Sequence, residues 1–271
     1  IQFHPQYKLN KKDKVELAAL PVIEEKTRKL IPYELKLNIL YEDKDFLAIN
    51  KPTGLISHPA PGHNKKTLAN AVKFYLNSKN EDNLGDERAG LIHRLDGPTS
   101  GVILFAKSPQ GLWFASKQFA NREVEKEYLA LVRGEVESEF DIDMPIGRDR
   151  INRKKYSPRT SKPRVAFTKI EPIASSGNAT LVLARPKTGR THQIRVHLAE
   201  SNHPIIGDGI YGKIRAKRLM LHAFRLTIAI DPKKPEIKKT FTASLDNTFL
   251  EVLKSYKIGT EWQRKLANKK N

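Results

Sequence analysis

Apolar and polar positions alternate along several short segments of this chain, and that alternation predicts β-strands. Leu35, Leu37, Ile39 and Tyr41 alternate with polar residues, and a polar turn at 42–45 separates them from the apolar run 46–49, which predicts a hairpin. Further strand-like runs lie at 101–106, 128–133, 165–171, 179–184 and 224–230. Because the run 128–133 is apolar on both faces until its end, we expect it at the centre of a sheet.

Two other segments have the apolar spacing of helices, and each is preceded by a capping residue. Thr67 can cap a segment whose apolar positions recur at helical spacing from Leu68 to Leu76. Ser108 is followed by Pro109, the residue type that suits the first helical position, and an apolar stripe continues to Phe119. Strands interspersed with a few helices, without an internal repeat, predict one α+β domain around a mixed, largely antiparallel sheet.

The net charge makes nucleic acid the first candidate partner. The 271 residues include 49 lysines and arginines against 30 acids, which gives a formal net charge of +19. Such an excess is self-repulsive and favours a polyanionic partner, with an anionic membrane surface second and a basic proteome background as the alternative. The stretch 148–164 holds eight of these cations and one acid. We interpret it as a phosphate-binding arm, with a solvated loop as the alternative.

Several classes of site are excluded by what the sequence lacks. Cysteine is absent, which excludes disulfides, thiolate catalysis and cysteine-rich zinc sites. No apolar run approaches the roughly 20 residues of a membrane helix, and there is no signal-peptide pattern. P-loop, dinucleotide and HExxH motifs are also missing, and Gly207-Asp208-Gly209 predicts only a tight turn. We therefore expect no cofactor, no metal ion, no membrane and a reducing, cytoplasmic location.

Three polar segments contain candidate chemistry. Asp96 lies in LIHRLDGPTSG (91–101), a turn that leads into an apolar strand, and Tyr128 opens an otherwise aliphatic strand. In KTGRTHQIRVHL (187–198), which Thr191 could cap as a helix, two arginines and two histidines suggest an anion-facing wall: Arg190, His192, Arg195 and His197. Taken singly, the three segments could equally be an ordinary turn, a packed tyrosine and a solvated helix face.

Together these segments resemble the RluA family of pseudouridine synthases. The family signature HRLD-x-x-T-S-G is present at 93–101, the tyrosine motif as KEYLALVRG at 126–134, and the C-terminal motif as GRTHQIRVHL at 189–198 followed by NHPIIGD at 202–208. INKPTGL at 49–55 and LMLHA at 219–223 match as well. The similar region runs in the family's order from about residue 35 to residue 245. The resemblance implies the pseudouridine synthase fold, with helices flanking the sheet and a central catalytic cleft.

The resemblance also implies a cofactor-free reaction that detaches uracil at N1 and rejoins it to the sugar through C5. Asp96 would be the essential carboxylate, which either attacks the anomeric carbon or removes a sugar proton. Arg195 would keep that acid ionised in a pocket that excludes water. Tyr128 would contact the base and help to remove the C5 proton, and Leu221 would form part of the apolar floor.

RNA recognition is expected from residues around these three. The target uridine must be flipped out of folded RNA, and Arg94 resembles the family residue that fills the vacated stack. His93 and Thr99 would support its loop, and Arg190 and His192 are further candidates for substrate or RNA binding. An RNA-binding or ribosome-assembly protein without activity is the main alternative, and a nucleic-acid glycosidase or nuclease is the second.

The loop 58–63 (HPAPGH) resembles the branch of the family that modifies large-subunit ribosomal RNA. In that branch an S4-type RNA-binding module precedes the catalytic domain. We therefore interpret residues 1–30 as the remnant of such a module plus a linker, and 31–271 as the catalytic domain. The sequence begins at Ile1 without a methionine, so we expect that an N-terminal piece is missing. We expect a monomer that binds ribosomal RNA.

Overall fold

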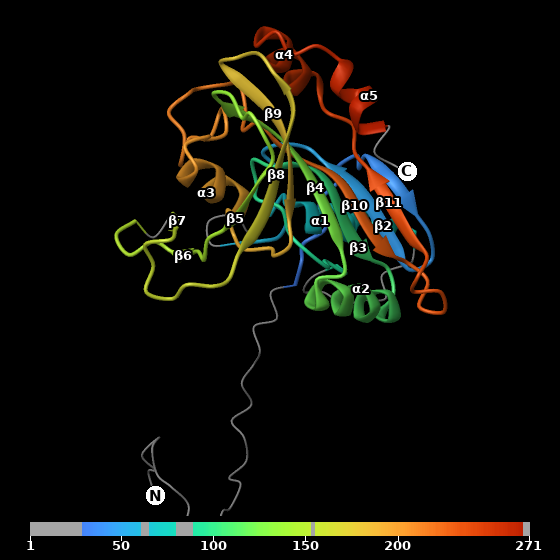
Figure 1. Ribbon diagram of the computed structural model, residues 1–271. Helices are drawn as coiled ribbons and strands as arrows, with labels where there is room; N and C mark the ends of the chain where they lie inside the picture. Colours follow the sequence, from blue (N-terminus) through green and yellow to red (C-terminus); the bar gives the residue numbers. More distant parts are fainter. Residues whose placement is uncertain (1–28, 61–64, 80–88, 153–154, 268–271) are drawn as a thin grey trace, which may run out of the picture.

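A computed structural model describes residues 29–60, 65–79, 89–152 and 155–267, and a nine-stranded sheet runs through it (Figure 1). The strand order is β1-β2-β3-β10-β4-β9-β8-β5, and β11 pairs with β10 beside this path. The strands are β1 (Ile39–Glu42), β2 (Phe46–Lys51), β3 (Ser100–Ala106), β4 (Glu125–Arg133), β5 (Phe140–Asp143), β8 (Phe167–Ser175), β9 (Ala179–Pro186), β10 (Leu221–Ala229) and β11 (Lys238–Thr242). A separate hairpin joins β6 (Gly147–Arg148) to β7 (Tyr156–Ser157).

The helices are α1 (Leu68–Ser78), α2 (Pro109–Asn121), α3 (Gln193–Glu200), α4 (Asn247–Ser255) and α5 (Glu261–Ala267). In Figure 1, α2 lies at the lower end of the sheet and α4 with α5 at its upper end. The strand pairs are antiparallel except β3 with β10, which confirms the predicted α+β class and its mixed, largely antiparallel sheet. β4 lies between β10 and β9, so the central position predicted for 128–133 is also confirmed.

Alternating side chains of β2 and β3 are buried on both faces of the sheet because a helix covers each face. Leu47 and Ile49 of β2 lie in one hydrophobic cluster with residues of α1. Phe46 and Ala48 lie in another cluster with Phe114 and other residues of α2. This two-sided burial explains why residues 46–49 of β2 and 102–106 of β3 are apolar without alternation.

The two predicted helix starts are confirmed. Thr67 accepts a hydrogen bond from the Asn70 backbone and caps α1, and Ser108 caps α2 with Pro109 in its first turn. The first strand begins later than predicted: residues 35–38 lie outside β1, which starts at Ile39. The hairpin of β1 with β2 is as expected.

The basic stretch 148–164 is more structured than a plain loop, because β6 and β7 pair within it. Its one acid organises the turn: Asp149 accepts hydrogen bonds from the Ile151 and Asn152 backbones and from the Ser157 hydroxyl. These bonds hold the pKa of Asp149 at about 2, the Asn152 backbone N–H being the largest cause. Arg159 then pairs with Glu200 of α3 at 2.8 Å, which connects the hairpin to the helix that carries Arg195.

Within the described ranges, no helix is long and apolar enough to cross a membrane, and no cluster of three or more His, Asp or Glu side chains could hold a metal ion. The proposed S4-type remnant lies almost entirely in residues 1–28, outside the described ranges. Residues 61–63 of the loop that resembles the ribosomal branch also lie outside them.

Candidate active site

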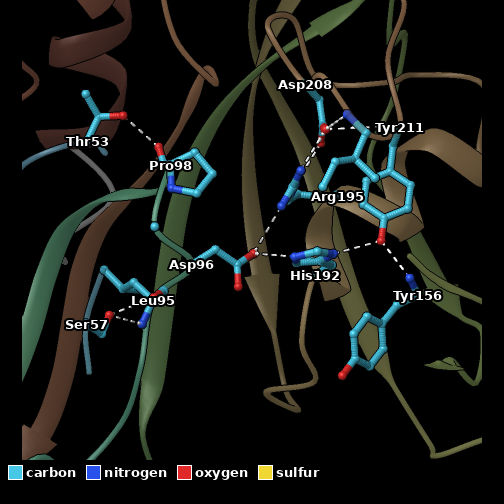
Figure 2. Close-up of polar contacts among 12 residues, drawn as sticks. Thr53, Ser57, Leu95, Asp96, Pro98, Tyr156, His192, Arg195, Asp208 and Tyr211 are labelled. Atoms are coloured by element: carbon cyan, nitrogen blue, oxygen red, sulfur yellow. Dashed lines mark hydrogen bonds and ion pairs between the residues drawn. The ribbon is translucent and has the colours of Figure 1, made fainter. Parts of the chain in front are cut away.

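Hydrogen bonds to neighbouring segments hold the loop that carries Asp96. The Thr99 backbone N–H donates to the Asp96 carbonyl at 3.0 Å and closes a tight turn. Thr53 donates to the Pro98 carbonyl at 2.8 Å, and the Ser57 hydroxyl bonds both backbone groups of Leu95 (Figure 2). The loop is therefore fixed on both sides of the carboxylate.

Lys51 adds a contact from beneath this loop. Its side chain is fully buried, and Nζ donates to the carbonyls of Pro52, Leu55 and Gly97 at 2.7–3.0 Å. Three carbonyl acceptors match the three donors of an ammonium group. Lys51 thus joins INKPTGL to the turn that carries Asp96.

Gly101 allows β3 to approach β10 beside this turn. Its φ of +112° lies in the left-handed region, and a Cβ there would overlap the backbone of Ala223. A side chain at 101 would therefore push the parallel pair of β3 and β10 apart. This explains in physical terms why the sequence HRLDGPTSG ends in glycine.

Arg195 extends from the first turn of α3 toward the carboxylate, and its main partner is a second acid. Its Nε and one terminal nitrogen each lie 2.8 Å from an oxygen of Asp208, and the other terminal nitrogen lies 3.5 Å from Oδ2 of Asp96 (Figure 2). Burial by itself raises the pKa of Asp208, but the hydrogen bonds and charge of Arg195 outweigh it and hold that pKa below its usual range. The fork pair fixes the guanidinium in front of Asp96.

The first turn of α3 differs from the prediction. Thr191 is not the helix cap: His192 occupies that position with φ +58°, and no side chain caps the helix there. Gln193 instead accepts from the Thr188 hydroxyl and the Arg190 backbone and donates to the Phe167 carbonyl, which holds the segment against β8. The left-handed residue turns the His192 ring toward Asp96, with Nε2 at 3.8 Å from Oδ2.

The nine residues predicted to act in catalysis or RNA binding line one cleft of about 730 Å³: His93, Arg94, Asp96, Thr99, Tyr128, Arg190, His192, Arg195 and Leu221. Tyr128 lies on β4 opposite Ala223 of β10 and Ala184 of β9. These small neighbours leave space beside its ring. Burial and the nearby Asp96 charge raise the pKa of the Tyr128 phenol, so it keeps its proton at neutral pH.

Some of these nine residues also have a structural role. Nε2 of His93 accepts from the Leu104 backbone at 3.0 Å, and its ring stacks on Phe119. Burial, with a smaller contribution from Lys126, lowers the pKa of His93 to about 3, so the ring is neutral. Arg94 is exposed at the rim of the cleft, whereas Thr99 is buried beneath it.

One expectation about this wall is wrong. His197 does not face the cleft, because it is fully buried and its ring nitrogens contact the Thr168 hydroxyl and the Met144 carbonyl. The Asp96 side chain is 26% exposed to the cleft, so the exclusion of water around it stays a prediction. A carboxylate that touches water is ready to receive a substrate that itself displaces the water.

Sequence reasoning missed the roles of Asp208 and Tyr211. Asp208 was interpreted only as part of a tight turn, which is correct locally: its Oδ1 accepts from the Ile210 and Tyr211 backbones. The preceding Gly207 has a φ of +78°, and a Cβ on it would overlap the Arg218 backbone, so the chain turns tightly just before Asp208. The Tyr211 hydroxyl contacts Nδ1 of His192 at 2.8 Å.

The arrangement presents one free carboxylate oxygen to the cleft. Oδ2 of Asp96 faces Arg195 and His192, while Oδ1 makes no hydrogen bond or ion pair with the described part of the chain. The guanidinium of Arg195 and the ring of His192 face one oxygen and orient the carboxylate, which leaves the other oxygen able to attack an electrophilic carbon or to take a proton. A tyrosine and an apolar floor beside it suit a planar base.

Comparison with known proteins assigns this fold and cleft to a class. Residues 45–200 match the family model described as RNA pseudouridylate synthase. The solved structure of Human RNA Pseudouridylate Synthase Domain Containing 1 superposes with a TM-score of 0.60 at 27% identity, covering 83% of this chain and 96% of that one. This chain belongs to the RNA pseudouridylate synthase family.

Two curated relatives are similar over most of this chain. Ribosomal large subunit pseudouridine synthase D of Borreliella burgdorferi is 37% identical over 84% of this chain and 71% of its own length. tRNA pseudouridine synthase C of Haemophilus ducreyi is 38% identical over 78% of this chain and 92% of its own length. This chain spans between 58% and 92% of the length of such relatives.

Proposed function

We propose that this protein converts uridine to pseudouridine in large-subunit ribosomal RNA, with Asp96 as the essential carboxylate. The observation that carries the proposal is Asp96 itself: one oxygen faces Arg195 at 3.5 Å, and the other is free in a cleft that Tyr128 and Leu221 also line. A protein that only binds RNA has no need of an oriented carboxylate facing its ligand.

The isomerisation breaks the bond between C1′ and N1 and forms a bond between C1′ and C5. Asp96 begins the reaction by attacking C1′ or by taking the C2′ proton, and the free oxygen Oδ1 can serve either step. After C5 has bonded to C1′, its proton must leave and N1 must gain one. Tyr128 keeps its proton at neutral pH and lies beside the base position, which suits a group that relays this proton or orients the ring.

Arginines and a lysine near one end of the cleft support an RNA substrate. Arg190 and Lys126 line the cleft, and Arg122 and Arg164 lie close enough to affect their charges. Burial and the repulsion of Arg164 and Arg122 lower the pKa of Arg190. No acid among the described residues forms an ion pair with any of the four, so a phosphate is the neutralising group that fits.

The choice of ribosomal RNA rests on the loop 58–63 and on the name of the Borreliella burgdorferi relative. Transfer RNA is the second candidate, because the Haemophilus ducreyi relative of similar identity is named for it. We further propose that the protein acts as a monomer in the cytoplasm, where a cysteine-free chain and a ribosomal substrate both fit a reducing compartment.

Base-resolution mapping of pseudouridine in cells with and without this protein tests the proposal. We expect specific sites in large-subunit ribosomal RNA to disappear, and restoration by the wild-type protein but not by Asp96→Asn. In a tritium-release assay the Asn variant should have no turnover while its RNA affinity stays within threefold of wild type. Substantial turnover by Asp96→Asn, or loss of sites in transfer RNA alone, would contradict the catalytic role or the ribosomal substrate, respectively.

A further inference from the structure

The side chain of His192 lies between the catalytic carboxylate and a tyrosine that the proposed reaction does not use. On one side, Nε2 is 3.8 Å from Oδ2 of Asp96, and on the other, Nδ1 is 2.8 Å from the Tyr211 hydroxyl. That hydroxyl is in turn 2.8 Å from the backbone nitrogen of Tyr156 in β7 (Figure 2). The series of contacts therefore runs from Asp96 to the hairpin of β6 and β7.

The direction of each hydrogen bond in this series of contacts follows from the donor at its end, the backbone N–H of Tyr156. A backbone N–H can only donate, so the Tyr211 oxygen accepts from Tyr156. The phenol has one proton of its own, and the other polar group within hydrogen-bond distance among the described residues is Nδ1 of His192. Donation of that proton to Nδ1 makes Nδ1 the acceptor and leaves the proton of the neutral ring on Nε2.

We propose that Tyr211 fixes His192 as the Nε2–H tautomer, so that His192 is a positioning residue that holds Oδ2 of Asp96 and leaves Oδ1 for the reaction. This inference rests on the proposed function. The separation of 3.8 Å exceeds a direct hydrogen bond, and catalytic hydrogen bonds often reach full contact only in the complex with substrate.

The charges around His192 agree with a neutral ring. It faces Asp96 from the loop before β3, Arg195 from α3, Asp208 and Tyr211 from the segment after α3, and the edge of the Tyr156 ring from β7. Burial lowers the pKa of His192, and Asp96 opposes that effect. Burial also raises the pKa of Tyr211 to about 12, so the phenol keeps the proton that it donates.

Through the same series of contacts, the position of the β6–β7 hairpin affects the position of the His192 ring. Tyr156 belongs to the segment that Asp149 organises and that carries the basic residues of 148–164. A movement of β7 when RNA binds would move the Tyr211 oxygen, and with it the ring that faces Asp96. The side chains of Tyr211 and His192 thus connect the β6–β7 hairpin to Asp96.

Nitrogen NMR of ¹⁵N-histidine-labelled protein measures the tautomer directly, without RNA or activity. The chain has 8 histidines, and His192→Gln identifies the signals of residue 192 by their loss. At pH 7.5 we expect the Nε2–H form in the wild type and a mixture with the Nδ1–H form in Tyr211→Phe. An imidazolium or an Nδ1–H ring in the wild type overturns the proposal and leaves the pseudouridine synthase assignment intact.

Kinetic measurements distinguish a positioning role of His192 and Tyr211 from a merely structural role. Tyr211→Phe should lower kcat about tenfold at pH 7.5 with little change in KM, and its activity should decline as the pH is lowered toward 6. The reason is that burial already lowers the pKa of His192, and loss of the hydrogen bond that the neutral ring accepts raises that pKa from its lowered value. More of the ring is then protonated at lower pH and pairs with Asp96. His192→Leu should lose about 100-fold in kcat, and His192→Gln, which keeps an N–H near the position of Nε2, should recover part of it.

Tyr75→Phe is the matched control, because it removes another partly buried phenol, which donates to Glu42 at 2.7 Å outside the cleft. This control should leave kcat and its pH profile as in the wild type. Equal activity of Tyr211→Phe and Tyr75→Phe at every pH from 6 to 8, or equal activity of His192→Gln and His192→Leu, would overturn the proposal.

Discussion

Replacing Asp208 by Asn should destabilise the protein strongly, although the change is nearly isosteric. The Asp208 side chain is fully buried and that of Arg195 is 4% exposed, with two N–O distances of 2.8 Å between them. Asn keeps the oxygen that accepts from the Ile210 and Tyr211 backbones, so the turn itself can persist. The charge that balances the buried guanidinium is lost.

Removing one partner of a buried ion pair costs about 3–5 kcal/mol in free energy of unfolding. Arg195 retains Asp96 at 3.5 Å as an acidic partner, which places our expectation at the lower end, about 3 kcal/mol. The matched control is Glu251→Gln, which breaks the Lys217–Glu251 pair at 3.0 Å with side chains 72% and 61% exposed. That change should cost about 0–1 kcal/mol.

Urea unfolding followed by circular dichroism measures both variants, with equal m-values as the check on two-state behaviour. Below pH 4 the difference between wild type and Asp208→Asn should shrink. The sign follows from the lowered pKa: an acid whose folded pKa lies below its unfolded value of about 3.9 stabilises the fold above that value and loses the contribution as the pH falls through the folded pKa. A cost for Asp208→Asn no greater than that for Glu251→Gln would refute the reasoning.

Three further predictions concern catalysis, RNA binding and acid stability. Tyr128→Phe should lower kcat by about 100-fold or more in the tritium-release assay, because the phenol beside the base is lost, while RNA affinity stays near that of the wild type. Arg190→Gln should weaken RNA binding at low salt and reduce the slope of log affinity against log salt by about 1 in fluorescence anisotropy; an unchanged slope would contradict a phosphate contact. Burial alone raises the pKa of Glu42, but hydrogen bonds from Lys107 and two further side chains lower it to about 2, so Glu42 stabilises the fold above pH 4.5 and less as the pH falls toward 2. Glu42→Gln should therefore be less stable than the wild type at pH 7 and closer to it at pH 3 in urea unfolding, and an equal difference at both values would count against this.

Much of the sheet was predictable because its strands bury both faces or start at recognisable turns. The helix starts were predictable for the same local reason, since Thr67 and Ser108 satisfy backbone N–H groups of their own helices. The register and the order of the strands could not be predicted from the sequence. β10 lies between β3 and β4, although it follows them by about a hundred residues, and nothing in the apolar run 224–230 specifies those neighbours.

The active site shows the same division between local and distant causes. The family resemblance placed Asp96, Tyr128 and Arg195 together, and the cleft contains all three. Composition and spacing alone left each of them open to an ordinary structural interpretation. Asp208 was missed because its local part, accepting backbone N–H groups in a turn, already accounts for an aspartate between two glycines. Only its distance to Arg195 reveals its second role, the buried ion pair.

The candidate active site also joins two parts of the sheet, the strands β1 to β3 and the strands from β10 to β5 in the spatial order. The loop that carries Asp96 is held by Lys51, Thr53 and Ser57, which come from the β2 end. Arg195 and His192 come from the segment after β9. The parallel pair of β3 and β10 connects these parts and depends on the close approach at Gly101. Because a carboxylate is oriented only when both parts supply its neighbours, a change that loosens this pair should reduce activity before it unfolds either part. Gly101 therefore contributes to the geometry of the candidate active site as much as to the fold.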